Sequence, residues 1–143
     1  MPIYRCSLPE GLLSYEQKLQ MSKEFTDIHC ELTNGTPRKF VHVIFEEVLE
    51  GGAFTGGAPS TVSKTVGFIR TGRTQETRSE LVRRLTEMWQ RISGQDNADI
   101  VVALHEVRPK DVMEWGEFLP DDGAEADWVE EHDLTRVGVY ATK

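Results

Sequence analysis

Basic residues are the minority charge in this chain of 143 residues, which has 16 lysines and arginines against 24 aspartates and glutamates. The net charge of −8 argues against nucleic acid or an anionic membrane as a partner, since both require a basic surface. No apolar run approaches the roughly 18 residues of a membrane span. The first residues also lack the basic and then apolar stretches of a secretory signal. We therefore expect a cytoplasmic protein with no nucleic-acid or membrane partner.

Cysteine is scarce as well, with two residues in the whole chain. In the absence of an export signal, Cys6 and Cys30 are expected to be reduced thiols of the core rather than a disulfide. The two cysteines and four scattered histidines lack the spacing of metal ligands, so we predict no metal and no organic cofactor. The remaining composition, 38% hydrophobic and 28% charged, is that of a single globular domain over residues 1–143.

Two stretches of the chain repeat one another at an offset of 60 residues. Apolar residues at positions 21, 25, 28 and 32 recur at 81, 85, 88 and 92, and their +4, +3, +4 spacing defines one face of a helix. Ser14 followed by Gln17 is a capping box, and Gly35 is a stop signal for the first helix. Thr74 is the corresponding cap of the second helix. The pattern predicts two helices that begin after residues 14 and 74.

Apolar runs of strand length flank both predicted helices. The same offset aligns Val41 with Val101 and Glu46 with Glu106. A strand, helix and strand in one sheet imply a right-handed crossover with parallel pairing. The predicted fold class is therefore α/β: two tandem β-α-β units, about residues 2–49 and 62–109, form a four-stranded sheet with both helices on one face. The other face is also apolar, and oligomerisation is the simplest way to cover it.

Two further segments carry less information. Residues 50–60, EGGAFTGGAPS, have the glycines of a phosphate-binding loop but lack its Lys-Ser/Thr, so a flexible linker or a short hairpin is expected. The C-terminal segment 110–143 becomes acidic from Pro120 onward and is expected to be solvated. Within it, Trp128 and the apolar residues 137–140 suggest that part of the segment docks on a neighbour.

Four short motifs occur in a fixed order: MPIY at the start, FTDIH in the first predicted helix, IRTGRT before the second, and MEWGEFLP near residue 114. Together they resemble the tautomerase superfamily and, within it, the cis-3-chloroacrylic acid dehalogenase family. Removal of Met1 would turn Pro2 into a terminal secondary amine, which can act as a general base or acid when its surroundings bring its pKa near 7. The resemblance implies that Pro2 is the proton-transfer residue.

The resemblance also implies roles for four other residues. Glu114 would activate water or orient a substrate group. His29, Arg70 and Arg73 would hold the carboxylate of the substrate. Guanidinium groups bind carboxylates in bidentate fashion, and the start of the second helix adds a favourable dipole.

The chain departs from the dehalogenases at one position, where their tyrosine is replaced by Ala103. His105 shares a strand face with Ala103 and is a partial substitute at best. The resemblance therefore implies a tautomerase of small enolisable or unsaturated carboxylates, with weak hydration or dehalogenation of cis-3-chloroacrylate-type substrates. The repeat of 60 residues and the uncovered sheet face lead us to expect a homotrimer. The alternative is a non-catalytic binding protein that keeps the fold and retains Met1.

Overall fold

The computed structural model describes residues 1–33 and 36–132. Its centre is a four-stranded sheet in the order β2-β1-β5-β6. The outer strands each run parallel to the neighbouring inner strand, and the two inner strands are antiparallel to each other. Parallel pairing within each β-α-β unit was predicted and is confirmed. The four strands are β1 (Ile3–Pro9), β2 (His42–Val48), β5 (Ser63–Arg70) and β6 (Ile100–Val107).

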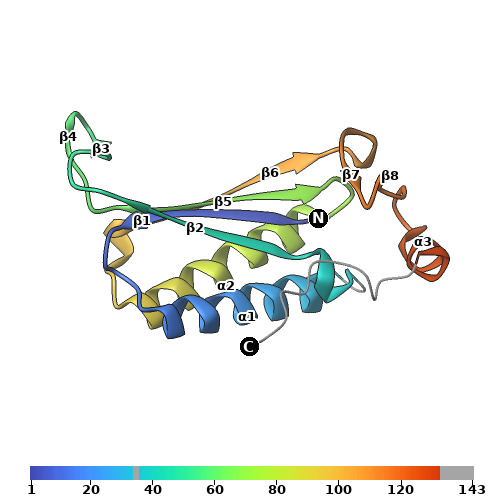
Figure 1. The fold of residues 1–143 in the computed structure, drawn as a ribbon, viewed down its shortest axis with the longest axis horizontal. Coiled ribbons are helices and arrows are strands. Elements are labelled where there is room, and N and C mark those ends of the chain that lie inside the picture. The colour runs from blue at the N-terminus through green and yellow to red at the C-terminus, as the bar shows by residue number, and fades with distance from the viewer. Residues whose placement is uncertain (34–35, 133–143) are drawn as a thin grey trace.

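Both long helices lie side by side on one face of this sheet (Figure 1). In α1 (Tyr15–Leu32), Ser14 and Gln17 form the predicted capping box. In α2 (Gln75–Ser93), the Thr74 side chain accepts the hydrogen bond of an N–H in the first turn. The predicted apolar faces of both helices are buried against the sheet, while Gly35 lies outside the described residues. The core contains Tyr4, Cys6, Leu8, Met21, Phe25, Ile28, Ile69, Leu81, Leu85 and Met88.

The offset of 60 residues holds for the helices but is wrong for the strands. In the first strands Leu8 is in the core, whereas Phe68 lies on the opposite face beside His105; the second strands differ in the same way. Val41 packs against the core, whereas Val101 is 47% exposed on the opposite face. Glu46 likewise lies on the open face, whereas Glu106 pairs with Arg78 of α2. The connection 33–41 before β2 is longer than the connection 94–99 before β6. An odd shift in register moves every side chain of a strand to the other face.

The glycine-rich segment is a hairpin, the second of the two alternatives. Its strands are β3 (Phe54–Thr55) and β4 (Ala58–Pro59), which pair antiparallel. Gly56 and Gly57 between them have φ angles of 61° and 83°, which only glycine adopts without strain. The hairpin lies at the end of the sheet farthest from the N-terminus (Figure 1).

The C-terminal part of the chain crosses the other end of the sheet (Figure 1). It contains the hairpin of β7 (Met113–Glu114) and β8 (Glu117–Phe118), followed by the short helix α3 (Glu125–Glu131). The apolar residues 137–140 lie outside the described residues. Among the helices that the structure describes, none has the length and apolar character needed to cross a membrane.

The face of the sheet opposite the helices is not covered by any described part of the chain. Ile44 and Val101 are exposed on it, and Phe68 stacks there on His105 with 5.6 Å between ring centroids. On the helix side, Cys6 is buried and Cys30 is half-buried, and both are free thiols.

Candidate active site

The end of the sheet where β1 begins gathers most of the predicted site residues. Pro2 is buried directly before β1, and its carbonyl accepts a hydrogen bond of 3.0 Å from the backbone N–H of His42. Arg70 is the last residue of β5, which runs antiparallel to β1, so it ends beside the point where β1 starts. Arg73 follows three residues later, immediately before the cap of α2. The antiparallel centre of the sheet therefore brings Pro2 and both arginines together.

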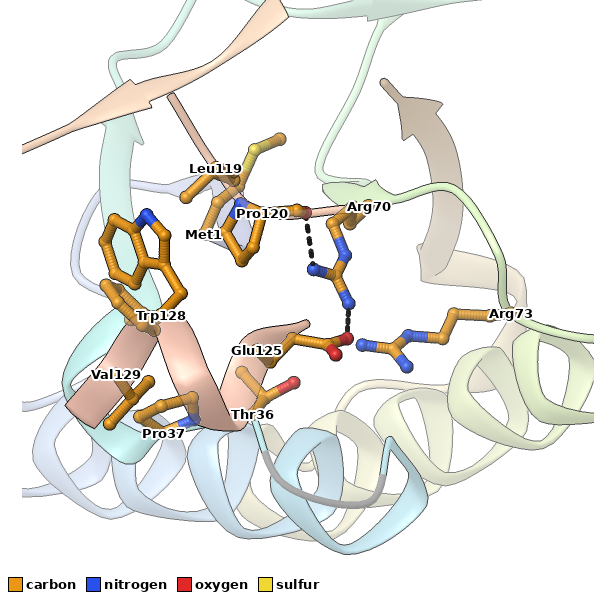
Figure 2. A pocket seen from close by; sticks show the side chains of 11 residues that line it. Met1, Thr36, Pro37, Arg70, Arg73, Leu119, Pro120, Glu125, Trp128 and Val129 are labelled. Carbon is orange, nitrogen blue, oxygen red and sulfur yellow. Dashed lines mark hydrogen bonds and ion pairs between the residues drawn. The ribbon is translucent and has the colours of Figure 1, made fainter. Parts of the chain in front are cut away.

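A small cavity separates the chain terminus from the two arginines (Figure 2). With Met1 in place its volume is about 30 Å³, room for little more than a water molecule. The acidic C-terminal segment closes it. The residues that line it are Met1, Thr36, Pro37, Phe40, Arg70, Arg73, Leu119, Pro120, Glu125, Trp128 and Val129.

The terminal amine is held by Glu114. The Met1 nitrogen donates a 2.7 Å hydrogen bond to Oε2 of Glu114, while Oε1 of the same carboxylate lies 3.0 Å from Nε2 of His42. Burial lowers the pKa of the Met1 amine; Glu114 opposes this shift and the positive charge of Arg70 adds to it. An amine at this place therefore loses its proton more readily than an exposed one.

Glu114 is positioned by the turn that follows it. Trp115 and Gly116 have φ angles of 58° and 78°, the two left-handed residues of a tight hairpin turn. Trp115 is the only described residue other than glycine with a positive φ, and its ring packs 4.8 Å from that of Phe40. Burial opposes ionisation of Glu114, but the hydrogen bonds with His42 and the terminal amine outweigh it and lower the pKa of this carboxyl. Glu114 is thus a fixed carboxylate anion.

The two arginines differ in their partners. Arg70 is 7% exposed and is engaged by the acidic segment: it donates to the Pro120 carbonyl at 3.1 Å and forms ion pairs with Asp122 and Glu125. The guanidinium of Arg73 makes no hydrogen bond or ion pair with any residue that the structure describes, and it points toward the cavity (Figure 2). Burial lowers the pKa of both arginines. Arg73 is therefore the cation available to a ligand.

His29 lies in the last turn of α1 and is 2% exposed. It does not line the cavity; its Nδ1 is 2.7 Å from the Tyr4 hydroxyl. Burial lowers the pKa of His29 to about 3, with smaller contributions from Arg73 and the terminal amine. The imidazole is neutral at pH 7, and both charges that depress its pKa belong to the site.

Two residues at the site were not predicted from the sequence. His42 contacts Glu114, whereas His105 stacks on Phe68 on the open sheet face. Glu125 pairs with Arg70, although its segment was expected to be solvated. Neither contact leaves a signal in the spacing of the sequence, because each joins segments that only the complete fold brings together.

Aromatic rings hold the C-terminal helix over the cavity. Trp128 of α3 stacks on Trp115 at 5.3 Å and lies 5.5 Å from Phe40, while His132 stacks on Trp128 at 4.2 Å. Trp128 docks on Phe40 and Trp115 of its own chain, because the Trp115 turn presents its ring toward α3. Contact of this segment with a second subunit stays a prediction.

Comparison with known proteins identifies the family of the chain. Residues 1–133 match the Tautomerase_3 family, described as “Putative oxalocrotonate tautomerase enzyme”, and the chain belongs to this family. The predicted resemblance to the tautomerase superfamily is confirmed. No curated protein matches the chain.

Solved structures show the same fold. The native Ps01740 protein is 36% identical, with a TM-score of 0.76 over 78% of this chain and 99% of its own. N1, described as a member of the cis-3-chloroacrylic acid dehalogenase family, is 25% identical, with a TM-score of 0.83 over 88% of this chain and 89% of its own. A fused 4-OT protein, described as an asymmetric trimer, is 18% identical, with a TM-score of 0.75 over 81% of this chain and 94% of its own, and supports the fold alone.

Proposed function

We propose that the chain, once Met1 has been removed, is a cofactor-independent tautomerase that uses the Pro2 amine on small enolisable or unsaturated carboxylates. The observation that carries this proposal is the shared cavity. It places the chain terminus, held by a carboxylate, opposite a half-buried arginine whose guanidinium has no described partner. A proton-transfer group facing an anion-binding group is what an enolisable acid requires.

Removal of Met1 would also make room for the substrate. In the present form Met1 fills the space beside both arginines, and the nitrogen of Pro2 is part of a peptide bond. Without Met1, the space that it occupies joins the cavity beside both arginines, and the Pro2 nitrogen becomes a secondary amine. Burial and Arg70 would lower the pKa of this amine, as they do for Met1.

The proposed tautomerase step needs only the neutral amine and the carboxylate clamp. Pro2 accepts the hydroxyl proton of the enol and delivers a proton to the neighbouring carbon, so that C=C–OH becomes HC–C=O. Arg73 and Arg70 hold the substrate carboxylate. His29 does not line the cavity while Met1 is present, so we propose it as a further donor only in the Met-free chain. In the tautomer that we propose, the Tyr4 hydroxyl donates to Nδ1, which leaves the proton on Nε2.

Hydration and hydrolytic dehalogenation are the weaker activities in this proposal. In them a protonated Pro2 gives its proton to C2 while Glu114 directs water at C3. Ala103 offers no second hydrogen-bonding group, and losing one such donor typically lowers a rate ~10²–10³-fold. The proposed ranking is therefore tautomerisation first and turnover of cis-3-chloroacrylate second.

The test compares preparations that differ only at the terminus. Intact-mass measurement identifies the Met-free chain, whose rate of phenylpyruvate ketonisation is compared with that of a Met-retaining form and of Pro2→Ala. We expect activity only in the Met-free chain with Pro2. Equal rates in all three would overturn the proposal. A chain that retains Met1 in its natural host and binds carboxylates without turnover would instead support the non-catalytic binding protein.

We also propose a homotrimer. The open sheet face exposes apolar side chains, including Ile44 and Val101, and the fused 4-OT protein with this fold is described as a trimer. Burying such a face between copies removes apolar surface from water. Sedimentation equilibrium at micromolar concentration tests this assembly; a stable monomer contradicts it.

A further inference from the structure

The Glu125 carboxylate occupies a place on Arg70 that suits the carboxylate of a ligand. It reaches the guanidinium from the cavity side, between the two arginines (Figure 2). We propose that Glu125 is a specificity-determining residue of the site: a ligand enters when its own carboxylate replaces that of Glu125 on Arg70. This inference rests on the proposed use of the two arginines as the carboxylate clamp.

The contact is buried and supported on several sides. Because Arg70 is only 7% exposed, its charge would be costly without a partner. Asp122 approaches Nε of Arg70 at 3.4 Å, and the Pro120 carbonyl accepts from Nη1 at 3.1 Å. The acidic segment therefore supplies one carbonyl and two carboxylates to a single guanidinium.

The turn between the arginines is shaped to accept this segment. Gly72 has a φ of 99°, and a Cβ atom at this position would overlap the carboxylate of Asp122. Glycine is thus required twice, for its backbone angle and for the close approach of the acidic segment. The fit at Gly72 involves β5, α2 and the C-terminal segment together, which distinguishes it from a chance surface ion pair.

The aromatic contacts of Trp128 hold Glu125 in place without themselves recognising a ligand. Trp128 is one turn beyond Glu125 on α3 and stacks on Trp115. When Glu125 leaves Arg70, α3 is therefore loosened but stays attached through the stacking of Trp128 on Trp115. The exchange remains feasible because Glu125 is in the first turn of a seven-residue helix.

Charge balance makes the exchange selective. A ligand carboxylate that replaces Glu125 leaves Arg70 paired, and the displaced Glu125 is hydrated by water. A neutral ligand of the same shape would leave Arg70 buried without a partner if it displaced Glu125, or would be excluded by Glu125 if it did not. Glu125 therefore selects anions and at the same time competes with them.

The experiment measures binding rather than turnover. Propionate and propionamide, which have the same shape and differ in charge, are titrated by NMR into the Met-free chain, Glu125→Gln and Glu130→Gln. Glu130 is an exposed residue of the same helix and provides the matched control. We expect propionate to bind at least tenfold more tightly to Glu125→Gln, with propionamide unchanged and Glu130→Gln like the original chain. Unchanged, weaker or absent propionate binding in Glu125→Gln overturns the proposal.

A second measurement needs no variant. Saturation of the original Met-free chain with propionate should speed hydrogen exchange of peptides covering residues 120–131, because α3 loses its contact with Arg70. If propionate binds and hydrogen exchange of these peptides stays the same, the proposed replacement of the Glu125 carboxylate by that of the ligand is contradicted. If the propionate results hold but phenylpyruvate is not turned over, the role of Glu125 stands and the tautomerase proposal fails. If turnover depends on Pro2 but propionate binding is unaltered in Glu125→Gln, the tautomerase proposal stands and the role of Glu125 fails.

Discussion

The two ends of the sheet are built from the same repeated unit, yet they present different chemical groups. At the candidate site, β1 starts at the chain terminus and β5 ends in Arg70. At the other end, β1 runs into Glu10, and β5 follows Val62, whose nitrogen lies inside the chain. The repeat gives both ends similar strands and helices. Only the end where β1 begins lies beside the chain terminus, where the proposed Pro2 amine would be.

The volume of the hollows does not identify the site. A hollow of about 400 Å³ at the far end is larger than the cavity at the candidate site. Glu10, Glu50 and a single lysine, Lys64, are its charged lining residues. Such a lining does not suit an anionic ligand. The comparison teaches that the site is identified by paired chemical groups rather than by volume.

The largest effect should come from removing the cation without a described partner at the site. Arg73→Ala is expected to lower kcat/KM for an enolisable carboxylate by about 10²–10³-fold, roughly 3–4 kcal/mol, because a desolvated charge pair with the substrate is lost. Steady-state kinetics of the Met-free chain measure it. Lys64→Ala in the far hollow is the control and should leave kcat/KM unchanged. Equal losses in the two variants would remove the distinction between the two ends.

The second prediction concerns equivalent positions of the two helices, His29 in α1 and Trp89 in α2. The pKa of His29 is about 3 in the folded chain, against an ordinary value of 6.5 for histidine. Below pH 6.5 the unfolded chain takes up a proton that the folded chain refuses, so stability falls as the pH falls toward 3. Between pH 7 and pH 5 this proton should cost about 2 kcal/mol.

Chemical denaturation at both pH values tests this assignment. His29→Gln, which keeps a polar partner for Tyr4, should lose about 2 kcal/mol less between pH 7 and pH 5 than the original chain. Trp89→Phe should keep the original acid sensitivity, because Trp89 carries no titrating proton. If His29→Gln retained the full acid sensitivity, another group would be responsible for it.

The parts of the fold that the sequence predicted correctly are those governed by local rules. Caps at Ser14 and Thr74 and the apolar spacing within each helix depend on residues a few positions apart. The alignment of Val41 with Val101 failed because strand faces depend on the lengths of the preceding connections.

The site residues also fall into those that short motifs predict and those that only the complete fold brings together. Pro2, Arg70 and Arg73 could be proposed from the short motifs that carry the family resemblance, whereas the antiparallel centre of the sheet that brings them together is seen only in the structure. The pairing of Glu125 with Arg70 could not, since an acidic tail has the same composition whether it is solvated or docked. The contact of His42 with Glu114 depends in addition on where the β7–β8 hairpin lies, which no local pattern specifies.

The third prediction is a moderate effect at His42. Its contact with Oε1 leaves Oε2 of Glu114 directed at the amine, so His42→Ala should lower kcat roughly tenfold with little change in KM. His42→Asn, which keeps a donor at a similar place, should restore part of kcat. His105→Ala is the matched control on the open face. A larger loss in His105→Ala than in His42→Ala would show that His105, and not His42, assists the reaction.

The smallest effect sharpens the comparison of the two ends most directly, because it uses the same kind of change at each. Ser14→Ala and Thr74→Ala both remove a helix cap and should each cost about 1 kcal/mol of unfolding free energy. Ser14 caps the start of α1 at the far end of the sheet, whereas Thr74 directly follows Arg73 (Figure 1). Loosening the start of α2 displaces the Arg73 guanidinium, so Thr74→Ala should lower kcat/KM a few-fold while Ser14→Ala leaves it unchanged. Denaturation and kinetics on the same two preparations measure both quantities. Equal stability losses with equal activity would mean that Arg73 is positioned independently of the helix that follows it.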